Sequence, residues 1–190
     1  MKNMSRKLLG KGIYLYTDIY KNNDMLYNSI KDSPVLWKKT TIKENLSDSY
    51  IKERSMAGQV SLAGLMTKDL DSLKLEIYKC YPIFLKIFSD YFLGKEDNFS
   101  LYEDIGLIKY SVGDFFENHA DSIVSSGRKY SVFYYLNDNY AGGEIVFADL
   151  NLKISPKANS MLIFPSGPEY AHEVLPVTYG NKYVISTFLK

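Results

Sequence analysis

The chain has 190 residues, a typical length for one domain and long enough to bury about two-thirds of its unfolded surface without disulfide bonds. Hydrophobic residues make up 46% of it, which excludes a disordered or fibrous protein. Lysine and arginine total 23 against 22 aspartate and glutamate residues, so no excess of positive charge indicates a nucleic-acid groove. The composition therefore predicts a globular domain that binds no nucleic acid.

The N-terminus is basic, and we expect it to be a solvated tail. Its only apolar run is Leu8-Leu9, which is too short for the core of a signal peptide. No apolar run anywhere approaches the roughly 18 residues that a membrane span needs. The single cysteine, Cys80, is expected to be a buried thiol in a reducing compartment. These features predict a cytoplasmic protein without a membrane span, either a monomer or a homodimer.

The first half of the chain predicts helices with few strands. Residues 12–20 are aromatic and β-branched, which favours a strand. A short helix is expected to begin at residue 23 or 24 and to end at Ser33-Pro34. Residues 38–58 are polar and mixed in charge, and they predict a loop.

The strongest helix signal begins at residue 71 or 72. Apolar side chains recur from there at steps of three and four residues, which predicts a helix with one face in the core. Pro82 predicts a kink or a division of this helix, and Gly94 predicts its end. The recurring residues are Leu70, Leu73, Ile77, Cys80, Tyr81, Phe84, Phe88 and Tyr91.

From about residue 99 onward the apolar period changes to two, which predicts strands. Turns rich in glycine, proline and asparagine separate the strands, so an antiparallel sandwich or barrel is expected, with the helices on one outer face. We expect a single domain in which residues 1–98 provide helical support and part of a substrate entrance, and residues 99–190 form the core. The predicted strands are residues 107–112, 130–136, 145–147, 152–154, 161–164 and 183–188.

Only two histidines occur in the chain, and both lie in the strand-rich half. His119 and Asp121 are two residues apart, so on an extended backbone both side chains point the same way. His172 follows a turn and precedes a strand, where it can supply a third ligand. Two imidazoles and one carboxylate suit iron(II) with open positions, although a zinc hydrolase would use similar ligands. Structural histidines without a metal are the ordinary alternative.

Lys182 lies ten residues after His172 within an apolar β pattern. A lysine is costly to bury unless an anion pairs with it, and an organic dianion that also chelates the metal would supply that charge. The alternative is an edge lysine that faces water.

Five ordered motifs extend these observations over residues 105–188. They are YSVGDFFENHAD at 110–121, RKYSVFYYLN at 128–137, AGGEIVF at 141–147, ISP at 154–156 with SMLIF at 160–164, and AHEVLPVTYGNKY at 171–183. In sequence and spacing they resemble the motifs of prolyl 4-hydroxylase-like, iron(II)- and 2-oxoglutarate-dependent dioxygenases. The resemblance implies a double-stranded β-helix, a jelly-roll of the cupin kind, with N-terminal helices packed on one sheet.

The resemblance also implies roles for individual residues. The iron ligands would be His119, Asp121 and His172. The residues that bind 2-oxoglutarate would be Lys182, Tyr110, Tyr135 and Ser131, with Lys182 on the distal carboxylate where many relatives carry arginine. Gly142 and Gly143 are expected to form a tight turn with positive φ angles, and Glu144 beside them is expected to be structural.

The activity that the resemblance implies is hydroxylation of a C–H bond with dioxygen and 2-oxoglutarate, which releases succinate and carbon dioxide. Ascorbate is implied as the reductant. The expected substrate is a prolyl residue in a peptide or protein, with loops 38–58, 122–127 and 137–143 as candidate lids. Two alternatives stay open: hydroxylation of another amino acid or a small metabolite, and a non-catalytic cupin-like metal-binding module.

Overall fold

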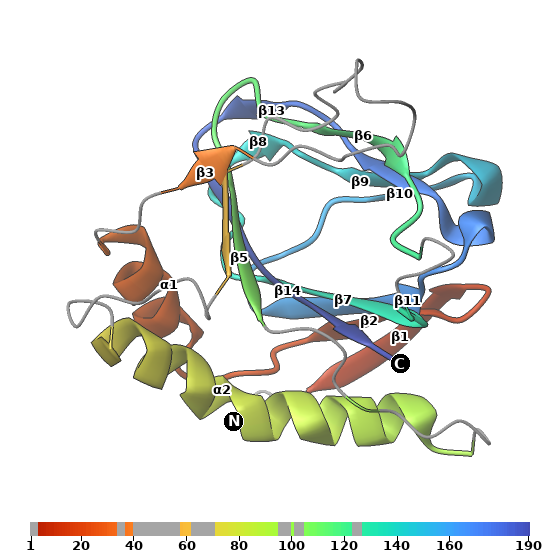
Figure 1. Cartoon of the computed structure of the whole chain (residues 1–190), viewed down its shortest axis with the longest axis horizontal. Helices are drawn as coiled ribbons and strands as arrows, with labels where there is room; N and C mark the ends of the chain where they lie inside the picture. Colours follow the sequence, from red (N-terminus) through yellow and green to blue (C-terminus); the bar gives the residue numbers. More distant parts are fainter. Residues whose placement is uncertain are drawn as a thin grey trace.

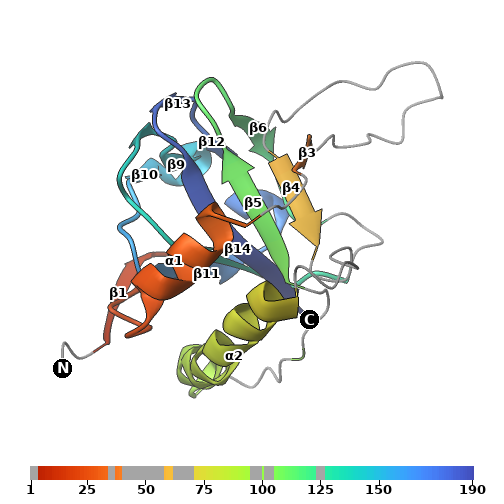
Figure 2. The same cartoon turned by 90° about the vertical axis from the view of Figure 1, so that its left-hand side faces the viewer.

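The computed structural model describes residues 4–33, 37–39, 58–61, 71–94, 100, 105–122 and 127–190. In this part of the chain a large and a small β-sheet face each other, and two α-helices cover the outer face of the larger sheet (Figure 1). A view from the side shows both helices next to that sheet and away from the smaller one (Figure 2). This arrangement is the predicted double-stranded β-helix with helices on one sheet.

The described helices are α1 (Asn23–Lys31), α2 (Asp71–Phe92) and the 3-10 turns η3 (Ala148–Leu150) and η4 (Pro168–Tyr170). The described strands are β1 (Ser5–Gly10), β2 (Ile13–Thr17), β3 (Lys38–Lys39), β4 (Gly58–Ser61), β5 (Gly106–Tyr110), β6 (Phe116–His119), β7 (Tyr130–Tyr135), β8 (Ala141–Gly142), β9 (Ile145–Phe147), β10 (Leu152–Ile154), β11 (Ser160–Pro165), β12 (His172–Val174), β13 (Val177–Tyr179) and β14 (Lys182–Leu189).

Three sheets are formed by these strands, and every pairing is antiparallel. The eight-stranded sheet has the order β1-β2-β11-β7-β14-β5-β4-β3, the four-stranded sheet the order β10-β9-β12-β6, and β13 pairs with β8. The longest strand, β14, lies between β5 and β7 in the middle of the large sheet.

Central strands of the large sheet are buried on both faces. In β7, Phe133 and Tyr135 face the barrel interior, whereas Val132 and Tyr134 pack against the helices. Because side chains alternate between faces, such a strand is apolar at almost every position. The interior face carries the side chains that form the site described below.

Helix α2 supplies most of the packing on the outer face of the large sheet. Its buried residues repeat at helical spacing, and Phe84 meets Tyr134 edge to face at 5.4 Å between ring centroids. Cys80 is buried, as predicted. The helix runs unbroken through Pro82, so the predicted division is wrong: Pro82 lies on the exposed side, and the buried residues before and after it stay packed on the sheet. None of the helices in the described ranges could cross a membrane.

The expectation of a solvated N-terminal tail is also wrong. Residues 5–10 form β1, which pairs with β2 and makes one edge of the large sheet. Arg6 pairs with Asp90 of α2 at 2.9 Å, and its guanidinium lies over the Tyr14 ring. An edge strand keeps its charges in water while its backbone is paired, which a hydrophobicity pattern does not reveal.

Two other strand boundaries differ from the prediction. β2 ends at Thr17 rather than near residue 20, because Asp18 adopts a positive φ of 55° that ends extended pairing. The predicted loop 38–58 begins with the short strand β3 and ends at the first residue of β4, and these two strands pair with each other. Residues 40–57 lie outside the described part of the chain.

Candidate metal and cosubstrate site

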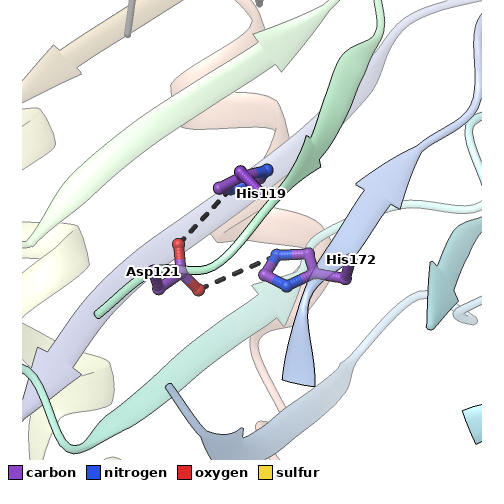
Figure 3. A group of neighbouring side chains, drawn as sticks. All are labelled: His119, Asp121 and His172. Carbon is purple, nitrogen blue, oxygen red and sulfur yellow. Dashed lines mark ion pairs between the residues drawn. The ribbon is translucent and has the colours of Figure 1, made fainter. Parts of the chain in front are cut away.

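Strand pairing in the smaller sheet brings the two histidines together. His119 ends β6, His172 begins β12, and the two residues are direct partners in the antiparallel register. Their ring centroids are 4.6 Å apart. Asp121 follows two residues after His119 and turns its carboxylate toward both rings (Figure 3).

The three predicted ligands offer one compact set of donor atoms. Asp121 Oδ1 lies 3.5 Å from His119 Nε2, and Asp121 Oδ2 lies 3.7 Å from His172 Nε2. One ligand atom from each residue lies within 4.8 Å of the other two. All three side chains are largely shielded from solvent, because His172 is 1% exposed and Asp121 7%.

Hydrogen bonds fix which ring nitrogen of each histidine is free. His119 Nδ1 lies 2.8 Å from the Glu117 carbonyl oxygen, and His172 Nδ1 lies 3.1 Å from that of Tyr170. Because a carbonyl oxygen only accepts, each Nδ1 carries the hydrogen and donates it. Each Nε2 then keeps a lone pair directed toward Asp121, which is the tautomer that metal ligation requires.

The electrostatics of the site favour an ionised Asp121 carboxylate beside a neutral His172 imidazole. Burial alone would raise the pKa of Asp121, but the neighbouring His172 and His119 rings and the hydrogen bond from Ser131 outweigh it and bring the pKa to about 2. Burial lowers the pKa of His172 to about 4, with Asp121 partly opposing the effect. At neutral pH both groups therefore have the protonation state of a metal ligand.

The donor set fits an iron(II) ion. Two ligand atoms bound at right angles to one ion at about 2.1 Å are about 3 Å apart. The observed separations of 3.5 and 3.7 Å are therefore about 0.5 to 0.7 Å wider. Two imidazoles and one carboxylate on one side of an octahedral ion are the set that suits non-haem iron(II) and leaves three positions open. The rings of Phe147 and Phe164 lie 5.3 and 5.1 Å from the His172 ring and keep this side of the site apolar.

Lys182, the predicted partner of a dianion, is buried in the barrel interior. It is 1% exposed and pairs with Tyr110 in the β14–β5 register. Its Nζ donates to the Gly143 carbonyl oxygen at 2.6 Å, and within the described ranges no carboxylate lies at ion-pair distance. Burial lowers the pKa of Lys182 to about 7, with Glu144 partly opposing it. The alternative interpretation, that Lys182 is an edge lysine that faces water, is therefore wrong.

Three tyrosine rings surround the Lys182 ammonium. The ring centroids of Tyr110, Tyr135 and Tyr140 lie 5.1, 5.2 and 6.0 Å from its Nζ. The first two belong to the predicted cosubstrate residues. Sequence reasoning did not assign Tyr140 to this site, and its buried hydroxyl has no hydrogen-bond partner in the described structure. Its position just before the Gly142-Gly143 turn was the signal that could have identified it.

The turn beside Tyr140 has the predicted conformation. Gly142 and Gly143 both have positive φ angles, 74° and 66°. A Cβ on Gly142 would clash with the Pro176 carbonyl oxygen, so only glycine fits at this position of β8 beside β13. Glu144 lies 3.4 Å from Lys153 at the surface, consistent with the structural role expected of it.

Ser131 lies at the metal end of the interior rather than beside Lys182. Its hydroxyl donates to Asp121 Oδ2 at 2.6 Å and lies 2.7 Å from the hydroxyl of Ser166. Ser166 was read in the sequence only as part of a turn. The structure therefore brings all seven predicted residues around two ends of one site, with Ser131 at the metal end, and adds Ser166 and Tyr140 to them.

Of the predicted lids, only loop 137–143 lies wholly in the described part of the chain. Asn137 fixes it to β14, because its side chain donates to the Asn181 carbonyl oxygen at 2.8 Å and accepts from the Tyr183 backbone at 2.9 Å. Most of the 38–58 and 122–127 loops lies outside the described residues. A lid role stays a prediction for all three.

Fold and site together define a class of protein. It is a double-stranded β-helix with two histidines and one carboxylate as a candidate metal site at one end and a buried lysine at the other. Residues 105–190 match the 2OG-Fe(II) oxygenase superfamily. This strand-rich region, which carries all seven predicted site residues, is therefore similar to a superfamily whose name gives iron(II) and 2-oxoglutarate.

Relatives and solved structures are similar to this chain in sequence or in fold. A candidate prolyl 4-hydroxylase of Acanthamoeba polyphaga mimivirus is 25% identical over 149 residues, 68% of this chain and 62% of that protein, so the chain spans less than two-thirds of that relative. The viral collagen prolyl hydroxylase of Paramecium Bursaria Chlorella virus-1, solved with 2-oxoglutarate, has a TM-score of 0.62 at 20% identity, covering 95% of this chain and 96% of that one. A Trichoplax adhaerens prolyl hydroxylase, solved with a peptide of hypoxia inducible factor, has a TM-score of 0.69 at 20% identity, covering 94% and 83%. The two structures share the fold.

Proposed function

We propose that this chain is an iron(II)- and 2-oxoglutarate-dependent dioxygenase that hydroxylates a prolyl residue of a peptide or protein and releases succinate and carbon dioxide. One observation carries the proposal. A convergent set of two imidazoles and a carboxylate shares the barrel interior with a lysine side chain that has no carboxylate partner among the described residues.

The residues of the chain have distinct tasks in this proposal. His119, Asp121 and His172 would hold iron(II), which when bound supplies the activation of dioxygen for oxidation of the C–H bond. Lys182 would pair with the distal carboxylate of 2-oxoglutarate, and the dianion would in turn restore the ordinary charge of the lysine.

Tyr110 and Tyr135 would orient the cosubstrate by donating hydrogen bonds. Burial raises the pKa of both phenols above their ordinary value, so the hydroxyls stay protonated at neutral pH. The phenylalanine rings around His172 would exclude water, which strengthens the charged contacts inside the site.

The prolyl substrate is proposed from the likeness to prolyl hydroxylases. It is supported by the assignment of the mimiviral relative and by the peptide bound to the Trichoplax enzyme. Ascorbate is proposed as the reductant that keeps the iron divalent.

The test is succinate release by the purified chain with iron(II), 2-oxoglutarate and ascorbate. Proline-containing peptides, free proline, other amino acids and small metabolites are compared, and mass spectrometry locates the added oxygen atom. The proposal expects stimulation by peptides, with oxygen on a prolyl ring, and none in an Asp121→Ala control. Stimulation only by a free amino acid or metabolite would replace the substrate. Absence of both turnover and the visible charge-transfer band of an iron(II)–2-oxoglutarate chelate would leave a metal-binding module.

A further inference from the structure

The carboxylate of Asp121 is held by a chain of two buried serines. Asp121 lies beyond the end of β6, so no strand ladder holds its backbone. Ser131 Oγ lies 2.6 Å from Asp121 Oδ2, and Ser166 Oγ lies 2.7 Å from Ser131 Oγ. The two serines are 0% and 1% exposed. Both contacts are therefore shielded from competing water.

The direction of these hydrogen bonds follows from the chemistry of the groups. An ionised carboxylate only accepts, so Ser131 must donate its one hydroxyl hydrogen to Asp121. Ser131 can then only accept from Ser166, which donates. A hydroxyl that accepts one hydrogen bond becomes a better donor in the next, and donation to a charged oxygen is stronger than to a neutral one.

Both serines are anchored by strong backbone pairing. Ser131 is in β7 and has partners on both sides, Phe164 in β11 and Phe188 in β14. The backbone of Ser166 donates to the Lys129 carbonyl oxygen at 2.8 Å and accepts from the Ser122 amide at 2.9 Å. The serine chain thus connects the segment that carries Asp121 to the middle of the large sheet.

We propose that Ser131 and Ser166 are positioning residues that fix the rotation of the Asp121 carboxylate and thereby set the affinity of the site for its metal ion. The inference rests on the proposed function, because it takes the three ligands to hold a metal. Neither serine touches the substrate or the metal; each acts through Asp121, Ser166 by way of Ser131.

The test measures binding of Mn(II) alone, followed by the electron paramagnetic resonance signal of the free ion. Ser131→Ala removes the donor to Asp121 and is expected to weaken binding about 10- to 100-fold, the range known for groups that orient metal ligands. Ser166→Ala leaves that donor in place and is expected to weaken binding by a smaller factor. Ser131→Thr keeps a hydroxyl on the same carbon and is expected to restore affinity.

Ser160→Ala is the matched control. Ser160 is also fully buried, its hydroxyl donates to the Lys157 carbonyl oxygen at 2.5 Å, and it lies at the opposite end of β11 from Ser166. This variant loses a comparable hydroxyl and is expected to bind Mn(II) like the wild type. A second readout is the visible band of the iron(II)–2-oxoglutarate chelate under nitrogen, which should shift in Ser131→Ala and stay in place in Ser160→Ala.

The outcomes separate the two proposals. If the wild type binds Mn(II), His172→Ala does not, and Ser131→Ala binds within threefold of the wild type, the positioning role is refuted and the proposed function stands. A wild type that binds no better than His172→Ala overturns both. If Ser131→Ala does not fold by circular dichroism, Ser166→Ala decides, since unchanged affinity and an unshifted band in that variant contradict the inference.

Discussion

Replacing Lys182 by methionine should stabilise the cosubstrate-free protein at neutral pH. The lysine is 1% exposed, and its ammonium has one carbonyl oxygen as hydrogen-bond partner and no carboxylate at ion-pair distance in the described structure. Methionine has a similar length, fills the same space and carries no charge. The variant therefore removes the cost of burying the charge while keeping most of the packing.

The size of the effect follows from the pKa of the lysine. Burial lowers that pKa from 10.5 to about 7, so between these values the unfolded chain binds more protons than the folded one. The free energy of unfolding of the wild type must then rise with pH in this window. The contribution of Lys182 is unfavourable by about 4 kcal/mol at pH 7 and by about 1 kcal/mol at pH 9.5. The advantage of the methionine variant should shrink by about 3 kcal/mol between these two pH values.

The assay is urea unfolding of wild type and variant, each without metal or cosubstrate, at pH 7 and 9.5. Only the difference between the two proteins is interpreted, because other groups titrate in both. Lys157→Met is the control, since Lys157 is largely exposed and its replacement should give no such trend. In wild type loaded with metal, 2-oxoglutarate should raise the melting temperature, and in Lys182→Met this rise should be lost. A wild-type-to-variant difference that does not change with pH, or a retained 2-oxoglutarate effect, would refute the reasoning.

Three further predictions concern the site and its frame. His172→Ala should abolish iron-dependent succinate release, because it removes one of three ligands; turnover near the wild-type rate at saturating iron would contradict the ligand assignment. Gly142→Ala should lower the free energy of unfolding by about 2–4 kcal/mol, since φ is 74° and the new Cβ would meet the Pro176 carbonyl oxygen; a loss near zero in urea unfolding would show that the turn can move. Tyr140→Phe should leave the free energy of unfolding unchanged or raise it by up to about 1 kcal/mol, because the buried hydroxyl has no partner in the described structure; a clear loss of stability by the same method would mean that this hydroxyl is hydrogen-bonded.

Local patterns predicted the parts of this molecule that depend on side-chain period. The two-residue spacing of His119 and Asp121 correctly indicated side chains that converge, and helical spacing identified α2. The pairing of His172 with His119 depends on strand register, which no local pattern contains. That the two histidines share one site was expected because ordered motifs resembled those of a known family, but their strand pairing was not predicted.

The features that sequence reasoning missed depend on contacts between distant segments. Ser166 follows β11 in a turn of ordinary composition, and its importance arises from contacts with Ser131, Ser122 and Lys129. In β1 the polar residues 5–7 occupy both faces and two adjacent leucines follow, so its backbone pairing with β2 leaves no periodic signal in the sequence. The sequence alone could not decide whether Lys182 is buried or exposed to solvent. The answer depends on which strands enclose its side chain.

The direct pairing of His172 with His119 limits where the chain can change length. Side chains alternate between the two faces of a strand, so losing or gaining one residue between β11 and β12 would shift Ala171 or Glu173 into the place of the imidazole and turn the ligand outward. The turn that contains η4 should therefore resist single insertions and deletions. The turn of η3, between β9 and β10, carries no ligand, and homologous chains should differ in length there far more freely.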